Sequence, residues 1–172
     1  MYKKAILITI SIFLLLTGSL IFLLKHNFNR SFHHKYTANT NLSSENMNGF
    51  YLYDNIHDEK FLKAYGRQNH KSFDHDVYNY YTIDNDIQIA TNQQDEILHF
   101  SVANKDVPSS KGIKVGDSLK KVKAAYGKNF YKRSEQGVDI LGYVDKRNHQ
   151  FIEFWHYQDK VLFYTLDDNS MK

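Results

Sequence analysis

The sequence contains no cysteine and a single proline, Pro108, among its 172 residues. The chain therefore forms no disulfide, no thiolate zinc site and no cysteine nucleophile, and it lacks the cysteine through which bacterial lipoproteins are anchored. Asn, Lys, Tyr and Ile are frequent instead, a composition typical of AT-rich bacterial genomes. We expect a bacterial, Gram-positive protein with room for one modest domain or two small repeats plus an anchor.

A basic excess is also missing from most of the chain. Residues 1–48 hold five bases and one acid, whereas residues 49–172 hold 17 bases and 18 acids. A nucleic-acid-binding domain concentrates Lys and Arg on one face, so this balance predicts no nucleic-acid partner. The N-terminal bases flank an apolar segment, where they suit anionic lipid headgroups.

The one long hydrophobic run covers residues 5–24 and carries no charge. A helix of 20 residues at about 1.5 Å per residue matches the roughly 30 Å hydrocarbon core of a bilayer. Because the apolar run continues past the small residues at Thr17, Gly18 and Ser19, it favours an uncleaved signal anchor over a cleaved signal peptide. We expect a short tail at 1–4, a single-pass transmembrane helix at 5–24 and a main domain outside the cytoplasm.

Residues 25–48 are polar and show neither helical nor strand periodicity. Such a segment predicts a flexible tether between the anchor and the domain.

The rest of the chain contains an internal likeness. FLKAYG, ending at Gly66, matches VKAAYG, ending at Gly127, and NQQDEILHFSV from Asn92 aligns without a gap to HYQDKVLFYTL from His156. Matching segments in the same order predict two tandem repeats, at 49–104 and 111–172, joined by residues 105–110.

Each repeat reads as a helix followed by an antiparallel meander. Both helices end at Tyr-Gly, where glycine supplies the left-handed turn that closes a helix. Runs rich in Tyr, Phe, Ile and Val with a period of two predict about three strands in each repeat. These runs are 77–83, 87–91 and 97–102, followed by 138–144, 150–157 and 161–166. The predicted fold class is α+β.

Ser118 lies in a Gly-Asp-Ser-Leu stretch that matches a motif of serine hydrolases. It also directly precedes an amphipathic run with Leu119, Val122 and Tyr126 on one face, which makes Asp117 or Ser118 a suitable helix N-cap. The aligned stretch of the first repeat offers Asp54 or Asn55 as a cap and has no serine. We therefore expect a cap, no catalytic residue and no enzyme, with a small hydrolase as the outside alternative.

The pattern GIKVGDSLKKVKAAYG, followed by a meander, resembles the tandem-repeat β-lactamase inhibitory protein fold and related envelope proteins. The resemblance covers roughly residues 49–168 and is sharpest over 112–127. It implies two αβ repeats joined into a curved sheet that holds a protein partner, such as a penicillin-recognising enzyme of the cell envelope. The inhibitor family has disulfides that this chain lacks, and its enzyme-contacting positions find no counterpart here.

A binding surface is predicted from strand pairing around a turn at Gln158 and Asp159. That pairing gives the second repeat an apolar face away from its helix, and this face is covered either by the same protein or by a partner. The candidate partner-binding residues are Ile152, Phe154, Val161 and Phe163.

A basic patch is the second candidate surface, because residues 105–172 hold 13 bases and nine acids. It is either a solvated helix face or a docking site for anionic wall polymer or lipid. Its members are Lys120, Lys121, Lys123, Lys128, Lys132 and Arg133. No spacing of residues predicts a metal site or a cofactor. The sequence thus predicts a membrane-tethered extracytoplasmic protein-binding or regulatory module, with an envelope-associated structural protein as the alternative.

Overall fold

The computed structural model describes residues 30–67, 77–84 and 86–171, together with Ile10, Phe13 and Thr17. It divides into two compact units, Met1–Tyr36 and Thr37–Lys172, which are described separately. The first unit contains the seven-residue helix α2 (Arg30–Tyr36), in which the rings of Phe32 and Tyr36 lie 4.6 Å apart.

The prediction of a membrane-spanning helix is not upheld. Within the part of the chain that the structure describes, no helix is both long and apolar enough to cross a bilayer. Apart from three single residues, the segment 5–24 lies outside the described residues.

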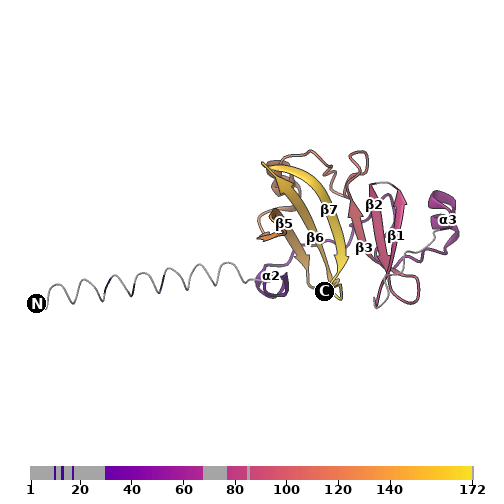
Figure 1. The fold of residues 1–172 in the computed structure, drawn as a ribbon, viewed down its shortest axis with the longest axis horizontal. Helices are drawn as coiled ribbons and strands as arrows, with labels where there is room; N and C mark the ends of the chain where they lie inside the picture. Colours follow the sequence, from indigo (N-terminus) through magenta and orange to yellow (C-terminus); the bar gives the residue numbers. More distant parts are fainter. Residues whose placement is uncertain are drawn as a thin grey trace, which may run out of the picture. The chain divides into compact units, whose positions relative to one another are not determined.

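The second unit is built on one antiparallel sheet of seven strands, in the order β1-β2-β3-β7-β6-β5-β4 (Figure 1). The strands are β1 (Asn79–Asp84), β2 (Ile87–Thr91), β3 (Ile97–Val102), β4 (Tyr131–Glu135), β5 (Val138–Asp145), β6 (Gln150–Tyr157) and β7 (Lys160–Asp168). β3 pairs with β7, and the partners include Phe100 with Leu166 and Val102 with Tyr164. This contact joins a three-stranded meander to a four-stranded one.

The predicted fold class, two tandem α+β repeats, is wrong because both meanders belong to one sheet. The described chain is mostly sheet with three helices, and buried side chains from both meanders belong to one large core cluster. The internal likeness in the sequence corresponds to the hairpins β2–β3 and β6–β7, which both carry a bulge near the tip. Similar hairpins therefore occur within a single sheet rather than in separable units.

Two short helices pack against this core. α3 (Glu59–Tyr65) buries Phe61, and α4 (Leu119–Tyr126) buries Leu119, Val122 and Tyr126. α4 begins as predicted, because Ser118 is its N-cap and its hydroxyl accepts a hydrogen bond from the Lys121 N–H. It ends at Gly127, whose φ of +90° is a conformation that favours glycine.

The sheet face that contacts α4 is called the inner face, and the opposite one the outer face. On the inner face, the Tyr126 ring lies 5.1 Å from Tyr143 and 5.2 Å from Phe154. Because successive strand residues alternate between faces, the apolar residues of one face of the sheet enter this core. Its sheet residues include Tyr81, Ile87, Ile89, Phe100, Val102, Leu141, Tyr143, Ile152, Phe154, Tyr164 and Leu166.

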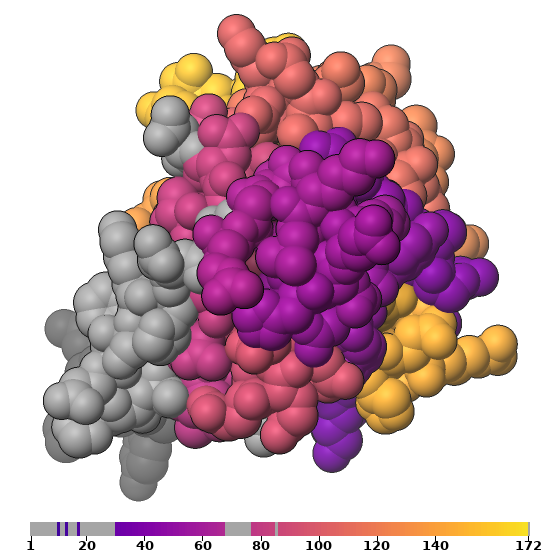
Figure 2. Space-filling model, turned by 90° about the vertical axis from the view of Figure 1, so that its right-hand side faces the viewer, coloured from indigo at the N-terminus to yellow at the C-terminus, as the bar shows by residue number. Residues whose placement is uncertain are grey.

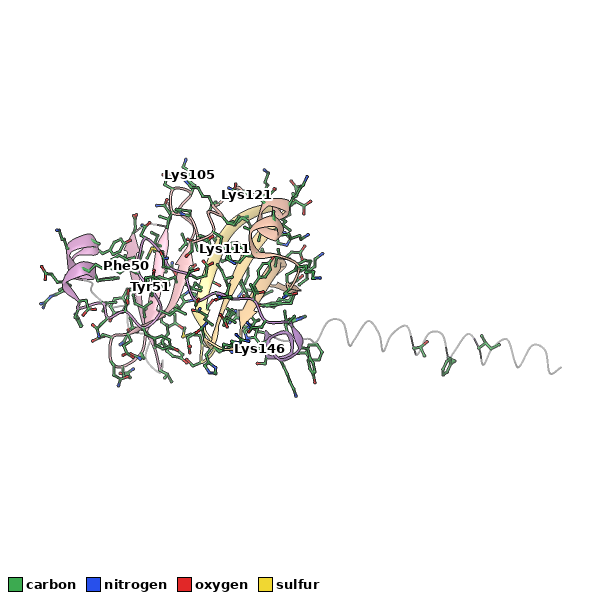
Figure 3. The ribbon with its side chains drawn as sticks, turned by 180° about the vertical axis from the view of Figure 1, so that it is seen from behind. Phe50, Tyr51, Lys105, Lys111, Lys121 and Lys146 are labelled. Atoms are coloured by element: carbon green, nitrogen blue, oxygen red, sulfur yellow. The ribbon has the colours of Figure 1, made fainter. Side chains whose placement is uncertain are left out.

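An irregular segment, residues 37–58, crosses the inner face and is called the strap. Its Leu42 and Met47 are 0% and 1% exposed and belong to the core. Its backbone bonds to both halves of the sheet, from Thr40 N to Val144 O at 2.8 Å and from Tyr53 N to Ile97 O at 2.7 Å. Figure 3 shows the strap crossing the strands near Phe50, and Figure 2 shows the segment that carries α3 over β1–β3.

The predicted flexible tether therefore ends earlier than expected. From Thr37 onward the chain belongs to the folded unit, because Leu42 and Met47 fill the core. The carboxylate of Asp145 also accepts a 2.8 Å hydrogen bond from the Leu42 N–H.

Candidate functional site

The outer face of β6 and β7 carries an aromatic platform. The rings of Trp155 and Phe163 are stacked, with centroids 5.0 Å apart and an interplanar angle of 21°, and both side chains are partly exposed. Trp155 and Phe163 are paired across the two strands. Tyr157, two residues further along β6, is 64% exposed. These three residues are called the aromatic platform below.

The platform is not the face that the sequence predicted. The Gln158-Asp159 turn is as expected, but beyond the pairing of His156 with Val161 a bulge shifts the register by one residue. A shift of one residue exchanges the two faces of a strand. Leu162 is left over at the bulge and is 43% exposed.

The four predicted partner-binding residues consequently separate. Ile152, Phe154 and Val161 are buried in the core cluster under α4 and the strap. Phe163 alone lies on the outer face, stacked on Trp155. The structure therefore does not bring the four together on an exposed surface.

A buried ion pair supports the platform from one side. Glu153, which is 0% exposed, accepts hydrogen bonds of 2.7 Å from both Nε and Nη2 of Arg133. The guanidinium also donates to Glu135 and lies 5.6 Å from the Trp155 ring. Burial disfavours the charged guanidinium, but the hydrogen bonds and charges of Glu153 and Glu135 raise the pKa of Arg133 overall. Arg133 is thus held as a fixed cation beside the indole.

The same carboxylate also receives the hydroxyl of Tyr131. The Tyr131 O–H donates to Glu153 Oε1 at 2.6 Å. To reach it, the ring passes over Gly142, which pairs with Tyr131 on one side and with Glu153 on the other. A Cβ at Gly142 would lie 2.2 Å from the Tyr131 ring, so this position accepts only glycine without rearrangement.

A second polar group lies further along β7 on the outer face. Nδ1 of His99 is 2.5 Å from Oδ1 of Asp167, and these residues are paired across β3 and β7. Thr165 lies between Phe163 and Asp167 on the same face. The outer face thus changes along β7 from aromatic to polar.

The β6–β7 hairpin that carries the platform is held in place at its tip. Gln158 and Asp159 both have positive φ, at 46° and 61°, as a type I′ turn requires. The loop before α4 pairs with the tip through Gly116 N to Val161 O at 2.8 Å and Leu119 N to Asp159 O at 3.0 Å. The platform therefore rests on a constrained hairpin.

Only some residues of the predicted basic patch are exposed next to α4. Lys120, Lys128 and Lys132 are exposed on or just after α4. Lys121 bonds the carboxylate of Asp117 at 2.7 Å, and Lys123 lies over the ring of Phe130. Arg133 points to the outer face and is paired with Glu153, so it does not belong to this surface.

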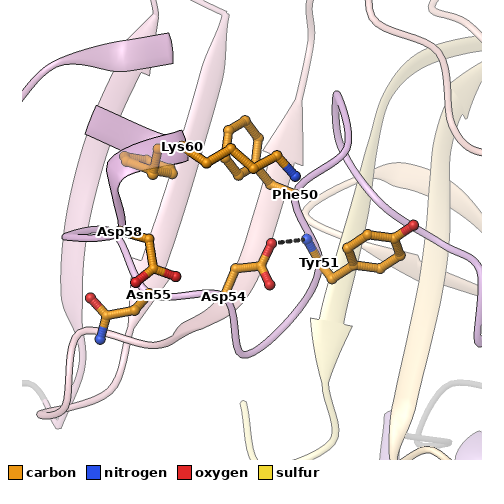
Figure 4. Close-up of a pocket in the computed structure, with 7 residues that line it drawn as sticks. Phe50, Tyr51, Asp54, Asn55, Asp58 and Lys60 are labelled. Carbon is orange, nitrogen blue, oxygen red and sulfur yellow. Dashed lines mark hydrogen bonds between the residues drawn. The ribbon is translucent and has the colours of Figure 1, made fainter. Parts of the chain in front are cut away.

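A hollow of about 300 Å³ lies beside α3 and is lined by Phe50, Tyr51, Asp54, Asn55, Asp58, Lys60 and Phe61 (Figure 4). One carboxylate oxygen of Asp54 accepts a hydrogen bond from the Tyr51 N–H at 2.9 Å. The ammonium of Lys60 lies 4.6 Å from the centre of the Phe50 ring and donates to the Gly49 carbonyl. The chain's own lysine thus lies against the wall of this hollow.

The predicted absence of a metal site and of catalytic residues stays a prediction. Among the residues with described positions, no group of three or more His, Cys, Asp or Glu side chains is placed to hold a metal ion. Ser118 has the capping role that the sequence predicted.

No model of a known protein family matches the chain, and no curated protein matches it. Among solved structures, a cysteine-rich secretory protein from Staphylococcus aureus is similar at 14% identity, over 70% of this chain and 45% of that chain, with a TM-score of 0.50. An extracellular protein containing a SCP domain, from Bacillus anthracis, is similar at 9% identity, over 68% and 46% of the two chains, with a TM-score of 0.45. The chain therefore spans less than half the length of each protein.

These comparisons concern the fold alone. The resemblance to the tandem-repeat β-lactamase inhibitory fold is wrong, since the chain forms one seven-stranded sheet and the solved structure that it resembles is that of a cysteine-rich secretory protein. The penicillin-recognising target that this resemblance implied loses its basis with it.

Sequence reasoning missed the aromatic platform and the Arg133–Glu153 pair. The bulge that exposes Trp155 has no glycine or proline to mark it. Tyr131 and Arg133, the partners of Glu153, lie on β4, about 20 residues earlier in the chain. They reach Glu153 on β6 only because β5 pairs with both strands.

Proposed function

We propose that the chain is an extracytoplasmic module that binds a protein partner through the outer face of its sheet. The observation that carries the proposal is the stacked, partly exposed pair of Trp155 and Phe163 with the fixed guanidinium of Arg133 beside it. Trp, Tyr and Arg are the residues that most often dominate the binding energy of protein interfaces.

The geometry of the platform suits recognition because it is already ordered. Arg133 is fixed by Glu153, and the hairpin tip is fixed by the loop before α4. A surface that is rigid before binding loses little conformational entropy when a partner docks. The exposed side chains of Tyr157 and Leu162 extend the apolar area toward the tip.

The extracytoplasmic location is supported by the fold. The similar protein from Staphylococcus aureus is described as secretory. The absence of cysteine from this chain fits an oxidising surrounding, where a free thiol would react.

The basic patch supports a second candidate function, docking on anionic wall polymer or lipid. Lys120, Lys128 and Lys132 are exposed together on or next to α4. Binding through these charges weakens as salt screens them, whereas binding through an aromatic platform does not.

A crosslinking capture experiment with envelope extracts tests the proposal. We expect the full chain to capture a partner that is lost in the variant Trp155→Ala/Phe163→Asp and retained by the control Tyr51→Asp. Tyr51 is also an exposed aromatic residue but belongs to the strap, on the inner face. Circular dichroism and thermal unfolding confirm that each variant folds.

Equal capture by the wild type and the platform variant would contradict the proposal. If capture instead disappears in Lys120→Glu/Lys128→Glu and at high salt, while the platform variant behaves as wild type, the anionic-surface function replaces it.

A further inference from the structure

We infer that the outer face holds a site for a cationic side chain of the partner, arginine or lysine, at Asp167 and Thr165. This inference rests on the proposed function, because it names the chemistry that the partner presents to the same face. The site lies next to the aromatic platform on β7 but uses different atoms.

The position of the site follows from strand geometry. Phe163, Thr165 and Asp167 alternate along β7 and therefore share the outer face. On the neighbouring strand β3, Ser101 pairs with Thr165 and His99 pairs with Asp167. At about 3.4 Å per residue, the carboxylate is roughly 14 Å along the strand from the ring of Phe163.

Two buried polar atoms at this position have no hydrogen-bond partner among the residues that the structure describes. Asp167 is 4% exposed, and its Oδ1 contacts His99, but its Oδ2 is unpaired. Thr165 is 7% exposed, and its Oγ1 is unpaired as well. A buried acceptor without a donor costs stability, and such atoms are rare in native proteins.

The unpaired atoms select the class of ligand. A carboxylate oxygen accepts hydrogen bonds only, so the ligand must present a donor to Asp167. Cationic donors form shorter and stronger bonds to a carboxylate than neutral ones do, and a positive charge compensates the buried carboxylate. The threonine hydroxyl can accept a second N–H from the same guanidinium or ammonium group.

The two parts of the outer face then make one recognition pattern. A partner segment lying along β7 would place an apolar side chain on Trp155 and Phe163 and its cation at Asp167. The side chain of His99 is 19% exposed and contacts the same carboxylate, so its ring reports on a cation bound at Asp167.

The test uses the full chain with isotope-labelled histidine, and the probe is N-acetyl-arginine amide. The His99 ring signals are assigned by their loss in His99→Gln. We expect these signals to shift in a saturable manner with the arginine probe. The matched control, N-acetyl-citrulline amide, has nearly the same shape without the charge and should leave them unchanged. Equal shifts with both probes, or no shift with either, would overturn the inference.

Substitutions localise the response. Asp167→Asn removes the charge and should abolish the shift, whereas Asp86→Asn, an exposed carboxylate in the β1–β2 turn, should preserve it. If Asp167→Asn does not fold, Thr165→Val weakens the site while keeping its shape and should reduce the response at equal probe concentration. Retained binding in the folded Asp167→Asn variant would overturn the site while leaving capture through Trp155 and Phe163 intact, so the two failures are distinguishable.

Discussion

Gly142 shows how strongly one residue can constrain a sheet surface. Its missing side chain provides the space over which Tyr131 reaches Glu153. We expect Gly142→Ala to lower the free energy of unfolding by about 1–3 kcal/mol, the usual range for overpacking. Urea unfolding measures the change. In a Tyr131→Ala background the same substitution should cost much less, and an equal cost in both backgrounds would contradict the steric explanation.

Ser118 acts at the residue scale as the N-cap of α4. Removing its hydroxyl leaves the Lys121 N–H without this partner, so Ser118→Ala should lower the unfolding free energy by about 1 kcal/mol. Thermal unfolding gives the value, with Ser43→Ala, an exposed serine of the strap, as the control. A change as small as that of the control would show that the cap contributes nothing.

At the scale of elements, the strap makes stability depend on pH through Glu45. Burial raises the pKa of Glu45, and hydrogen bonds from Tyr126 and Ser110 and the charge of Lys111 oppose this rise only in part. The folded state therefore holds this proton more tightly than the unfolded chain. Its contribution to stability is present at low pH and declines as pH rises above the ordinary pKa of glutamate, about 4.3.

The corresponding variant is Glu45→Gln, which imitates the protonated group. We expect it to raise the unfolding free energy at neutral pH and to flatten the decline with pH. Denaturant unfolding at a series of pH values measures both effects. Glu59→Gln, an exposed residue of α3, serves as the control and should follow the wild-type curve.

Asp145, at the end of β5, has the opposite effect on how stability depends on pH. Burial alone would raise its pKa, but bonds from Leu42, Asn148 and Arg147 lower it below its ordinary value. Ionised Asp145 therefore stabilises the fold at pH values above its pKa in the unfolded chain, about 3.9. This stabilisation is lost as the pH falls through the lower pKa of the folded state. The pH profile should therefore be a dome, with Asp145 limiting the acid side.

The β6–β7 turn is an element in a costly conformation. Gln158 and Asp159 both have positive φ, which costs roughly 1–2 kcal/mol for an ordinary residue and less for asparagine or glycine. Replacing the pair with Asn-Gly should raise the unfolding free energy by about 0.5–2 kcal/mol, as measured by urea unfolding. Gln94→Asn, in a turn without a positive φ at that residue, is the control, and an unchanged stability would contradict the assignment.

Elements that are marked by neighbouring residues in the sequence were predictable. Features that depend on contacts between distant residues were not. The period of two along β2 and β3, together with the cap and glycine of α4, identified these segments from sequence. The strap was missed because Leu42 and Met47 are isolated apolar residues in a polar segment and bury themselves only against strands made much later. The platform was missed because one bulge shifts the register of β7 against β6 by one residue, so that Trp155 pairs with Phe163 on the outer face.

On the scale of the whole molecule, the pairing of β3 with β7 predicts that both meanders unfold together. Trp155, the only tryptophan, reports on the second meander. Phe100, in the first, is fully buried against Leu166. We expect Phe100→Ala to lower the unfolding free energy by about 3–5 kcal/mol in the transition seen by Trp155 fluorescence. An unchanged fluorescence midpoint, with a separate earlier transition in circular dichroism, would indicate independent halves.

The strap also sets the order in which the protein can acquire its fold. Its Leu42 N–H bonds to Asp145, a partner 103 residues further along the chain. During synthesis or export the strap emerges first, yet its docking surface on β5 is complete only when residue 145 has followed. Contacts between such distant residues slow folding and leave apolar segments exposed in the meantime. Chaperones and proteases at the exit site therefore meet an undocked strap in every newly made chain.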